Sequence, residues 1–534
     1  MRNAGFLWLM VGVLLLASVL RIYHLNLQGL WGDEGWSVEF SESANPKDVV
    51  RALVPDLHPP LYFMMLALWR DVAGNSEIAM RLLAVYSALL TVAILPHLTT
   101  NKTAGVIAAL VLALSDKHVV LSQEVRHYPT AFLMMAVCSW LFLRWLKQPT
   151  RQNTLLYAIS IIASVYIHYY TALILFVQLL YTLVKCHKRI YALFLMMALS
   201  MIAFLPWTFV AWYQLLIRPE GILHSMPLSW DTLEYLSVDF LGRPPILLLS
   251  LIGLSLGHLK KRQTPYLYSL LWFIVPIIIT ILVYPFVTVL TDRNMALLLL
   301  PIAILAGQGA LWLEPRGRWL LAAIITINGV ASLDSYQIHP PWRELATYVA
   351  EHYPANETVF MDVRGGDKAL RYHLTQLLPA DTEIVSVNQL RLDYGIYFLG
   401  VWEQYLQQNE GFWIAYWVNE NEHWDIAPRM EQAGYIRTAT YRTYHLGKPI
   451  ELYHYDKLPT LDEVVALFGG TIRLHRVKYP SVVTTDTLPV SLWWSSVEPL
   501  SVSYSISVFL LNEDGQLVAQ QDGPPQDGNA PTTQ

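Results

Sequence analysis

Long apolar runs fill the first part of this 534-residue chain and decide what it can fold into. A helix that crosses a bilayer needs about 20 mostly apolar residues, because the hydrocarbon offers no water to its backbone amides. Runs of this kind recur from residue 5 to residue 335, and the remaining sequence has the mixed composition of a soluble region. The charged fraction of 14% agrees with a membrane protein, since soluble proteins carry about 25%.

Eleven runs qualify as predicted membrane spans, some of them barely. They are 5–23, 79–98, 104–119, 128–146, 154–168, 169–185, 190–211, 245–259, 265–285, 295–313 and 318–335. The first lacks a small-residue cleavage site, so it is interpreted as a signal anchor and not as a removed signal peptide. A further apolar segment, 59–73, is short and opens with two prolines.

The basic residues decide how segment 59–73 is counted, because cytoplasmic loops carry an excess of lysine and arginine. If the segment lies along the membrane interface, four basic clusters fall on the cytoplasmic side: Arg144/Lys147/Arg151, Lys185/Lys188/Arg189, Lys260/Lys261/Arg262 and Arg316/Arg318. If it spans, all four move outside. The sequence therefore predicts an interfacial helix, a multi-pass protein of the plasma membrane with a cytoplasmic N-terminus, and external loops at 24–78, 120–127, 212–244 and 286–294.

The soluble tail is also predicted to lie outside the cytoplasm, and it divides into two regions. Region 336–457 has mixed signals, with a helix at 342–352 and strands at 358–363, 412–418 and 451–455. Region 458–534 is β-rich, and its alternating runs TIRLHRV, LPVSLWW, VSYSISVFLL and QLVAQQ are typical of a β-sandwich. These strands are too few to close a sandwich, which leaves two readings open: a truncated sequence, or a small sheet packed on its neighbour. With the membrane region 1–335, three domains are predicted.

Acidic residues stand just beyond the first span, in the motif LWGDEGW at 30–36. Acids this close to a bilayer are costly, so Asp33 and Glu34 are candidates for a general base or a metal ligand. The alternative is a solvated loop acid or a helix cap. His58 follows in the segment DLHPPLYF, before two prolines that hold the backbone extended. It is a candidate for substrate or metal binding, against a structural hydrogen-bonding role.

The second predicted external loop, SQEVRHY at 122–128, is nearly all polar and has almost no length to spare. Glu124 is a candidate catalytic acid or metal ligand, and Arg126 and Tyr128 are candidate substrate-binding residues. Arg293, before the tenth span, is a second candidate cation, because arginine stays charged and binds phosphate through two hydrogen bonds. Structural ion pairing is the alternative for both arginines. The net charge of −5 provides no basic stripe for nucleic acid.

In order along the chain, these motifs resemble the GT-C superfamily of membrane glycosyltransferases, in particular bacterial relatives of protein O-mannosyltransferases and of the lipid A aminoarabinose transferase. The resemblance covers about residues 1–335. It rests on LWGDEGW, on HPPLYF, on Arg81 at the start of the second span, on SQEVRHY, on FLPW at 204–207 and on DRN at 292–294. The family often has Arg-Tyr where this chain has Arg293-Asn294.

The resemblance implies a GT-C fold and transfer of a sugar from a polyprenyl-phosphate donor, with inversion at the anomeric carbon. Asp33 matches the family's catalytic base or metal ligand, Glu34 stands beside it, and Glu124 matches the acid of the second external loop. Arg126 and Arg293 would neutralise the departing phosphate. A divalent metal would take its ligands from Asp33, Glu124 and His58. The acceptor would be a glycan, a lipid or a protein outside the cytoplasm.

Two other functional classes are weighed against the enzyme. A transporter or flippase for a lipid-linked or polar solute would place charges near the middle of its spans, whereas here the acids cluster in predicted external loops. A membrane-anchored sensor or carbohydrate-binding protein would use the soluble tail and would leave the loop acids unexplained. The sequence therefore favours the glycosyltransferase.

Overall fold

The computed structural model divides the chain into two compact units, Met1–Pro340 and Pro341–Gln534, and we describe each by itself. The residues it describes are 3–43, 45–99, 101–216, 226–241, 264–286, 290–331, 339–353, 357–363, 365–417, 426–479, 488, 490–502 and 504–524. The predicted span 245–259 lies outside these ranges. The division into three domains stays a prediction.

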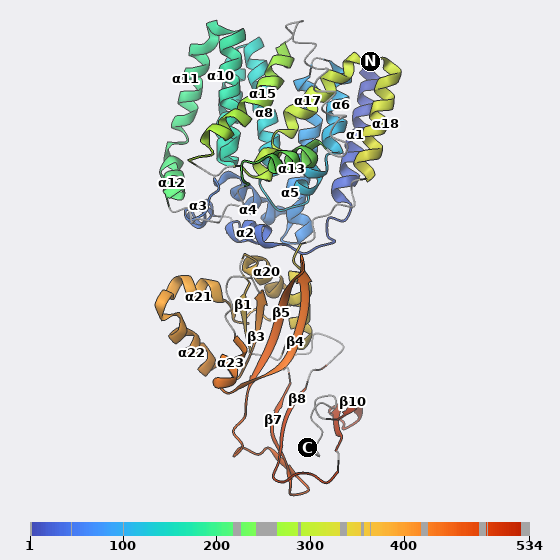
Figure 1. Cartoon of the computed structure of the whole chain (residues 1–534), viewed down its shortest axis with the longest axis vertical. Coiled ribbons are helices and arrows are strands. Elements are labelled where there is room, and N and C mark those ends of the chain that lie inside the picture. The colour runs from blue at the N-terminus through green and yellow to red at the C-terminus, as the bar shows by residue number, and fades with distance from the viewer. Residues whose placement is uncertain are drawn as a thin grey trace. The chain divides into compact units, whose positions relative to one another are not determined.

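The first unit is helical (Figure 1). Its helices are α1 (Asn3–Ile22), α2 (Gly32–Phe40), α3 (Pro46–Leu53), α4 (Leu61–Ala73), α5 (Glu77–Ile94), α6 (Lys102–Ala113), α7 (Asp116–Ser122), α8 (Tyr128–Lys147), α9 (Arg151–Ile167), α10 (Leu173–Lys185), α11 (Ile190–Ile202), α12 (Leu205–Leu216), α13 (Trp230–Leu241), α15 (Thr264–Val283), α16 (Asp292–Ala296), α17 (Leu299–Gly309) and α18 (Pro315–Ala331). Short 3₁₀ turns are η1 (Leu95–Leu98), η2 (Tyr169–Ala172), η3 (His187–Arg189) and η5 (Ala310–Trp312).

Several of these helices are suited to a bilayer, so the chain is a multi-pass membrane protein. Among the described residues, five helices are long and apolar enough to cross a membrane: Ala4–Ile22, Glu77–Leu98, Tyr128–Lys147, Tyr266–Val283 and Asp292–Trp312. The number rises to seven if each of two bent helix pairs counts as one span. Helices of 17 residues also occupy the predicted spans 154–168 and 318–335. The count of eleven spans stays a prediction.

Two segments predicted as single spans are broken in the structure. The run 104–119 forms α6 and α7, which meet at 64°, and the run 190–211 forms α11 and α12, which meet at 72°. The second break precedes Pro206, which has no backbone N–H to donate and therefore suits the first turn of a new helix. The first break introduces a polar turn, in which Asp116 and Lys117 open α7.

The helices α2, α3 and α4 gather at one end of the first unit (Figure 1). The helix α4 has only 13 residues, too few for the ~20-residue span of a bilayer. Asn45 caps α3 by accepting a hydrogen bond from the Lys47 amide, and Pro46 occupies the first helical position, as the sequence predicts. Short helices at this end therefore carry the polar residues of the first predicted external loop.

The second unit contains a mixed five-stranded sheet with the strand order β2-β1-β3-β5-β4. Its strands are β1 (Thr358–Asp362), β2 (Ile384–Ser386), β3 (Gly411–Trp417), β4 (Tyr435–His445) and β5 (Lys448–Lys457). The strands β2, β1 and β3 run parallel, and β5 and β4 are antiparallel neighbours. The accompanying helices are α19 (Trp342–His352), α20 (Asp367–Leu377), α21 (Val387–Tyr394), α22 (Phe398–Gln408) and α23 (Ile426–Gln432), with η6 at Gly395–Tyr397.

The sequence located these elements well, because each has a strong local pattern. The helix predicted at 342–352 is α19, and the strands predicted at 358–363, 412–418 and 451–455 lie on β1, β3 and β5. Aromatic and aliphatic side chains, among them Phe360, Trp402 and Phe412, form the buried core between the sheet and α21, α22 and α23.

The C-terminal region is β-rich, as predicted. Within its described residues, β6 (Ala466–Phe468), β7 (Ile472–Lys478) and β8 (Ser491–Ser496) form a three-stranded sheet, and β9 (Ile506–Leu511) pairs with β10 (Leu517–Gly523). The turn at Asn512–Gly515 joins β9 to β10, with Gly515 at φ 75°. These strands form two separate small sheets.

Candidate active site

Asp33 stands at the centre of a charged site in the first unit. It lies in the first turn of α2, where a carboxylate interacts favourably with the helix dipole. The Arg293 side chain of α16 donates a hydrogen bond to Asp33 Oδ2. Arg126, between α7 and α8, donates to the Asp33 backbone carbonyl at 3.0 Å and places its Nη2 3.9 Å from Asp33 Oδ2. Two arginines that are distant from each other in the sequence therefore share one carboxylate.

The two arginines control the charge of Asp33. Burial alone would raise the pKa of the Asp33 carboxyl, but Arg126 and Arg293 outweigh this effect and lower the pKa to about 2. The Asp33 side chain is still 37% exposed, whereas those of Arg126 and Arg293 are 6% and 21% exposed. Asp33 is therefore an ionised carboxylate at the surface of a buried cationic layer.

Aromatic rings flank the two guanidinium groups. The Arg293 guanidinium lies 4.8 Å from the ring centroid of Trp31 and 5.9 Å from that of Tyr128. The Arg126 guanidinium lies 5.8 Å from the same tyrosine ring. Cation–π contacts of this kind hold a planar guanidinium without using up its N–H donors.

Each arginine has an acidic neighbour in sequence, but neither arginine has that neighbour as its ion-pair partner. Asp292, next to Arg293, pairs with Lys117 of α7 at 2.6 Å. Arg126 turns to Asp33 and Ser37, and Glu124 lies two residues before it in the chain. Both arginines therefore contact the same partner, Asp33.

Glu34 has a different environment from its neighbour, Asp33. It is fully buried and forms a double ion pair with Arg81 of α5, at 2.9 Å and 2.7 Å. The Val125 amide also donates to Glu34 Oε1 at 2.8 Å. Arg81 in turn donates to the carbonyls of Leu25 at 2.7 Å and of Gln28 at 3.0 Å. This network fixes the loop before α2 and leaves Glu34 no free face for a substrate.

Glu124 is buried and incompletely paired. It is 2% exposed, and within the described part of the chain its Oε2 has no hydrogen-bond partner. Burial raises the pKa of the Glu124 carboxyl to about 7. A cavity of about 40 Å³, lined by Glu124, Arg81, Gln123 and His339 among others, adjoins it and has room for water. A carboxyl group with this pKa exchanges a proton near neutral pH.

His58 belongs to a second cluster, made of histidines. Its Nδ1 lies 2.5 Å from Asp56 Oδ1, and its ring centroid lies 4.6 Å from that of His127. The His127 ring lies 4.7 Å from the His168 ring, at the end of α9. Both ring nitrogens of His127 are buried and, among the described residues, unpartnered. Burial lowers the pKa of His127 well below the usual range, so this ring is neutral.

The predicted metal ligands do not form a compact set. Asp33, Glu124 and His58 are not among the groups of three whose ligand atoms lie within 4.8 Å of one another; in the described ranges, the only such group lies in the second unit. Asp33 Oδ2 is moreover engaged by Arg293. Because these residues do not fit a shared metal ion, we derive no catalytic step through one.

The structure thus gathers Asp33, Arg126, Tyr128 and Arg293. Arg293 also opposes the effect of burial on the pKa of Glu124, and His58 helps to lower the pKa of Asp33, while the side-chain hydrogen bonds of Glu34 and His58 go to Arg81 and Asp56. Sequence reasoning did not select Trp31, Lys117 or His127 as site residues. Trp31 and His127 stand inside the motifs LWGDEGW and SQEVRHY, which were usable signals. Lys117 gave no such signal, because its partner Asp292 is distant in sequence.

The chain has an ArnT-like fold with several apolar helices. Two crystal structures of ArnT from Cupriavidus metallidurans, one in the apo state and one bound to undecaprenyl phosphate, are similar to this chain with TM-scores of 0.63 and 0.58. Each match covers 85% of this chain and 98% of the other at 14% identity. The GT-C resemblance predicted from the motifs is therefore confirmed at the level of the fold.

The sequence itself gives one further match. Residues 90–192 match the family model described as the protein O-mannosyl-transferase TMEM260 N-terminal domain. This segment runs from the end of α5 to α11 and includes Glu124, Arg126 and Tyr128. No curated protein sequence matches the chain significantly.

The contrast between Glu34 and Glu124 predicts opposite effects on stability. Glu34→Gln removes the main charge partner of the buried Arg81 and leaves only the longer contact with Glu77 at 3.8 Å, so we expect the free energy of unfolding to fall by about 3 kcal/mol. Glu124→Gln removes a carboxyl whose ionised form is disfavoured by burial. Between the ordinary pKa of 4.5 and about 7, the folded wild type binds the extra proton, so its stability falls as the pH rises.

The free energy of unfolding of the detergent-solubilised protein checks this prediction. It is measured from pH 4.5 to pH 8, about the window of the two pKa values. We expect the Glu124→Gln variant to lack the decline that the wild type shows, and to match or exceed wild-type stability at the alkaline end. A Glu34→Gln variant as stable as the wild type would show that the Arg81 pair is not structural.

Proposed function

We propose that this protein is a glycosyltransferase that moves a hexose or pentose from a polyprenyl-phosphate donor to an acceptor hydroxyl outside the cytoplasm. The observation that carries the proposal is the layer of two arginines, Arg126 and Arg293, over which one carboxylate, Asp33, is partly exposed. The ArnT fold supports it, since one matched ArnT structure is bound to undecaprenyl phosphate. A glycan, lipid or protein hydroxyl would serve as the acceptor.

Asp33 and the donor phosphate would compete for the same two arginines, and this competition suggests a mechanism. With both arginines on Asp33, its pKa of about 2 makes the carboxylate a poor base. A donor phosphodiester carries one negative charge, like the carboxylate, but it offers more acceptor oxygens and gains a second charge as the sugar leaves, so it competes with Asp33 for the guanidinium groups. The pKa of Asp33 then rises toward its ordinary value. The carboxylate becomes able to take the proton of an acceptor hydroxyl only when the donor is bound.

The chemical step is a single displacement. The acceptor oxygen attacks the anomeric carbon, its proton passes to Asp33, and the bond from that carbon to the phosphate oxygen breaks. Negative charge grows on the departing phosphate, and Arg126 and Arg293 stabilise it in the transition state. One displacement inverts the anomeric configuration. Glu124, with its pKa of about 7, is a second group near the site that can hold a proton at neutral pH.

The orientation in the membrane is part of the proposal. Contacts join Asp33, Arg126 and Arg293, which come from three separate predicted external loops. Met226 and Leu290, from two of the predicted loops, are also joined by a backbone hydrogen bond of 2.8 Å. These contacts support a common side of the membrane for these loops, and the basic clusters favour the side outside the cytoplasm.

Labelling of single cysteines in whole cells tests this orientation. Lys47 and Gln148 are both exposed, on a predicted external and a predicted cytoplasmic segment. In a background without Cys138 and Cys186, we expect a membrane-impermeant maleimide to label Lys47→Cys in intact cells and Gln148→Cys only after lysis. The reverse pattern would place the site in the cytoplasm and exclude the proposed donor geometry.

Replacement of the proposed base should abolish turnover without unfolding the protein. Asp33→Asn keeps the size of the side chain but cannot accept the acceptor proton, so we expect turnover to fall by at least about 100-fold. Release of polyprenyl phosphate from a panel of polyprenyl-phosphate sugars measures the activity. Activity close to wild type in Asp33→Asn would move the basic role to another residue and defeat the mechanism.

Replacement of the arginines by lysine tests the phosphate site. Lysine keeps the charge but lacks the planar fork that binds two oxygens, so Arg126→Lys and Arg293→Lys should each raise the donor KM by about tenfold or more. Arg51→Lys is a matched control, because Arg51 lies on α3 with a side chain 81% exposed. Equal mild effects at all three positions would indicate a diffuse basic surface and would remove the arginine assignment. Arg243, in the loop before the predicted eighth span, lies outside the described residues.

A further inference from the structure

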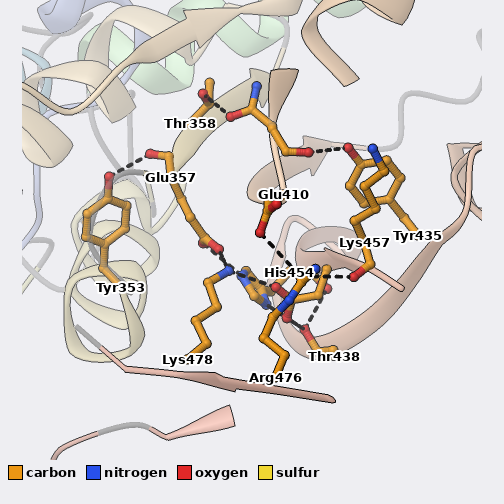
Figure 2. Close-up of polar contacts among 12 residues, drawn as sticks. Tyr353, Glu357, Thr358, Glu410, Tyr435, Thr438, His454, Lys457, Arg476 and Lys478 are labelled. Carbon is orange, nitrogen blue, oxygen red and sulfur yellow. Dashed lines mark hydrogen bonds and ion pairs between the residues drawn. The ribbon is translucent and has the colours of Figure 1, made fainter. Parts of the chain in front are cut away.

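The second unit contains a cluster of ionisable side chains that the proposed transfer reaction does not use (Figure 2). Glu357 precedes β1, His454 and Asp456 lie on β5, and Lys478 ends β7. The side chains of Glu357, His454 and Asp456 are 4%, 7% and 0% exposed. Charged groups are rarely buried in this way unless they are paired or bind an ion.

The alternation of side chains along β5 and its pairing with β3 bring these residues together. His454 and Asp456 are two positions apart on β5, so they point to the same face of the sheet. Asp456 pairs with Gly411 across β3 and β5. A Cβ at position 411 would lie under 3.0 Å from atoms of Glu357, Lys478 and Asp456. The absence of a side chain at Gly411 therefore leaves the space in which the cluster sits.

The side chains are arranged around one point. His454 Nε2 lies 2.8 Å from Glu357 Oε2, and His454 Nδ1 lies 3.4 Å from Asp456 Oδ2. The Lys478 ammonium contacts Glu357 and lies 2.8 Å from Asp456 Oδ1 (Figure 2). Glu357, His454 and Asp456 each offer one ligand atom, and these atoms all lie within 4.8 Å of one another. Tetrahedral zinc needs ligand atoms roughly 3.4 Å apart, so small side-chain rotations would close the set.

The charge of the cluster is not balanced by Lys478 alone. The two buried carboxylates share the ammonium with the His454 ring, whose Nε2 lies near Glu357 and whose Nδ1 lies near Asp456 and Thr438. A divalent cation in place of the ammonium would balance the two carboxylates, with the imidazole neutral as a metal ligand requires. Lys478 is also the most exposed member, at 19%, and its flexible stem allows the ammonium to withdraw into water. Its departure would therefore leave no buried positive charge unpaired.

We propose that Glu357, His454 and Asp456 form a binding site for a divalent transition-metal ion of the zinc type, and that Lys478 fills the position of the ion when it is absent. Imidazole with carboxylates suits zinc, whereas magnesium and calcium prefer oxygen ligands throughout. Binding of the ion exchanges the ion pair between β7 and β5 for metal coordination. The site therefore links metal binding to the attachment of the C-terminal sheet.

Zinc binding by the metal-stripped, full-length protein in detergent tests the proposal. Wild type, His454→Gln, Lys478→Met and the control His475→Gln are dialysed against buffered free zinc, and the bound metal is measured by mass spectrometry. His475 is a buried histidine on β7, bonded to Ser495 at 2.6 Å and outside the cluster. The difference in zinc content between wild type and His454→Gln reports on this site alone, because zinc bound elsewhere in the protein is present in both.

We expect wild type and His475→Gln to bind one zinc ion more than His454→Gln, and Lys478→Met to bind that ion at least tenfold more tightly. Added zinc should raise the melting temperature of Lys478→Met and leave that of His454→Gln unchanged. Asp456→Asn serves in the same comparison if His454→Gln does not fold. Equal zinc content in wild type, His454→Gln and Lys478→Met would overturn the proposal and make the cluster a structural ion pair. Sugar transfer is not the readout, so this result does not depend on the transferase proposal.

Discussion

The ion pairing of Asp33 with Arg126 and Arg293 is the constraint around which the first unit is organised. It joins the start of α2, the turn before α8 and the start of α16. Surface ion pairs contribute only about 0–1 kcal/mol, so partly exposed pairing of this kind does little for stability. The pairing holds the cationic donors in place and leaves them available for exchange with a phosphate ligand.

More deeply buried interactions provide the stability that this exchange requires. Arg81 joins the fully buried Glu34 to the carbonyls of the preceding loop, and the buried Lys117 binds the partly exposed Asp292 beside Arg293. Close backbone packing adds to this. At Gly307 of α17 a Cβ would lie 3.0 Å or less from atoms of Ala104 and Ala108 in α6. Only a glycine allows the two helices to approach so closely, and α17 follows directly on the segment that carries Arg293.

The sequence predicted what depends on local pattern and composition. Apolar runs located most of the helices of the first unit, Asn45-Pro46 located the start of α3, and the alternating runs located β1, β3 and β5. The breaks between α6 and α7 and between α11 and α12 were missed, because a bent pair and a straight span have the same hydropathy. The motifs also selected Asp33, Arg126 and Arg293 before any contact between them was known. The sequence did not predict which charged residues pair with each other, because Lys117 with Asp292 and Arg81 with Glu34 are pairings between distant segments.

Asp33 and Glu34 are neighbours with opposite environments because successive residues of an α-helix point about 100° apart. One carboxylate therefore turns to the partly exposed arginine layer, and the next turns into the buried contact with α5. The two acids act as independent constraints although they read as one motif. Insertion or deletion of a residue ahead of them would alter the segment whose Leu25 and Gln28 carbonyls bind Arg81, so the length of the segment between α1 and α2 is restricted by the same arginine that pairs with Glu34. A search for proteins with the same chemistry should use that spacing together with the identity of the two acidic residues.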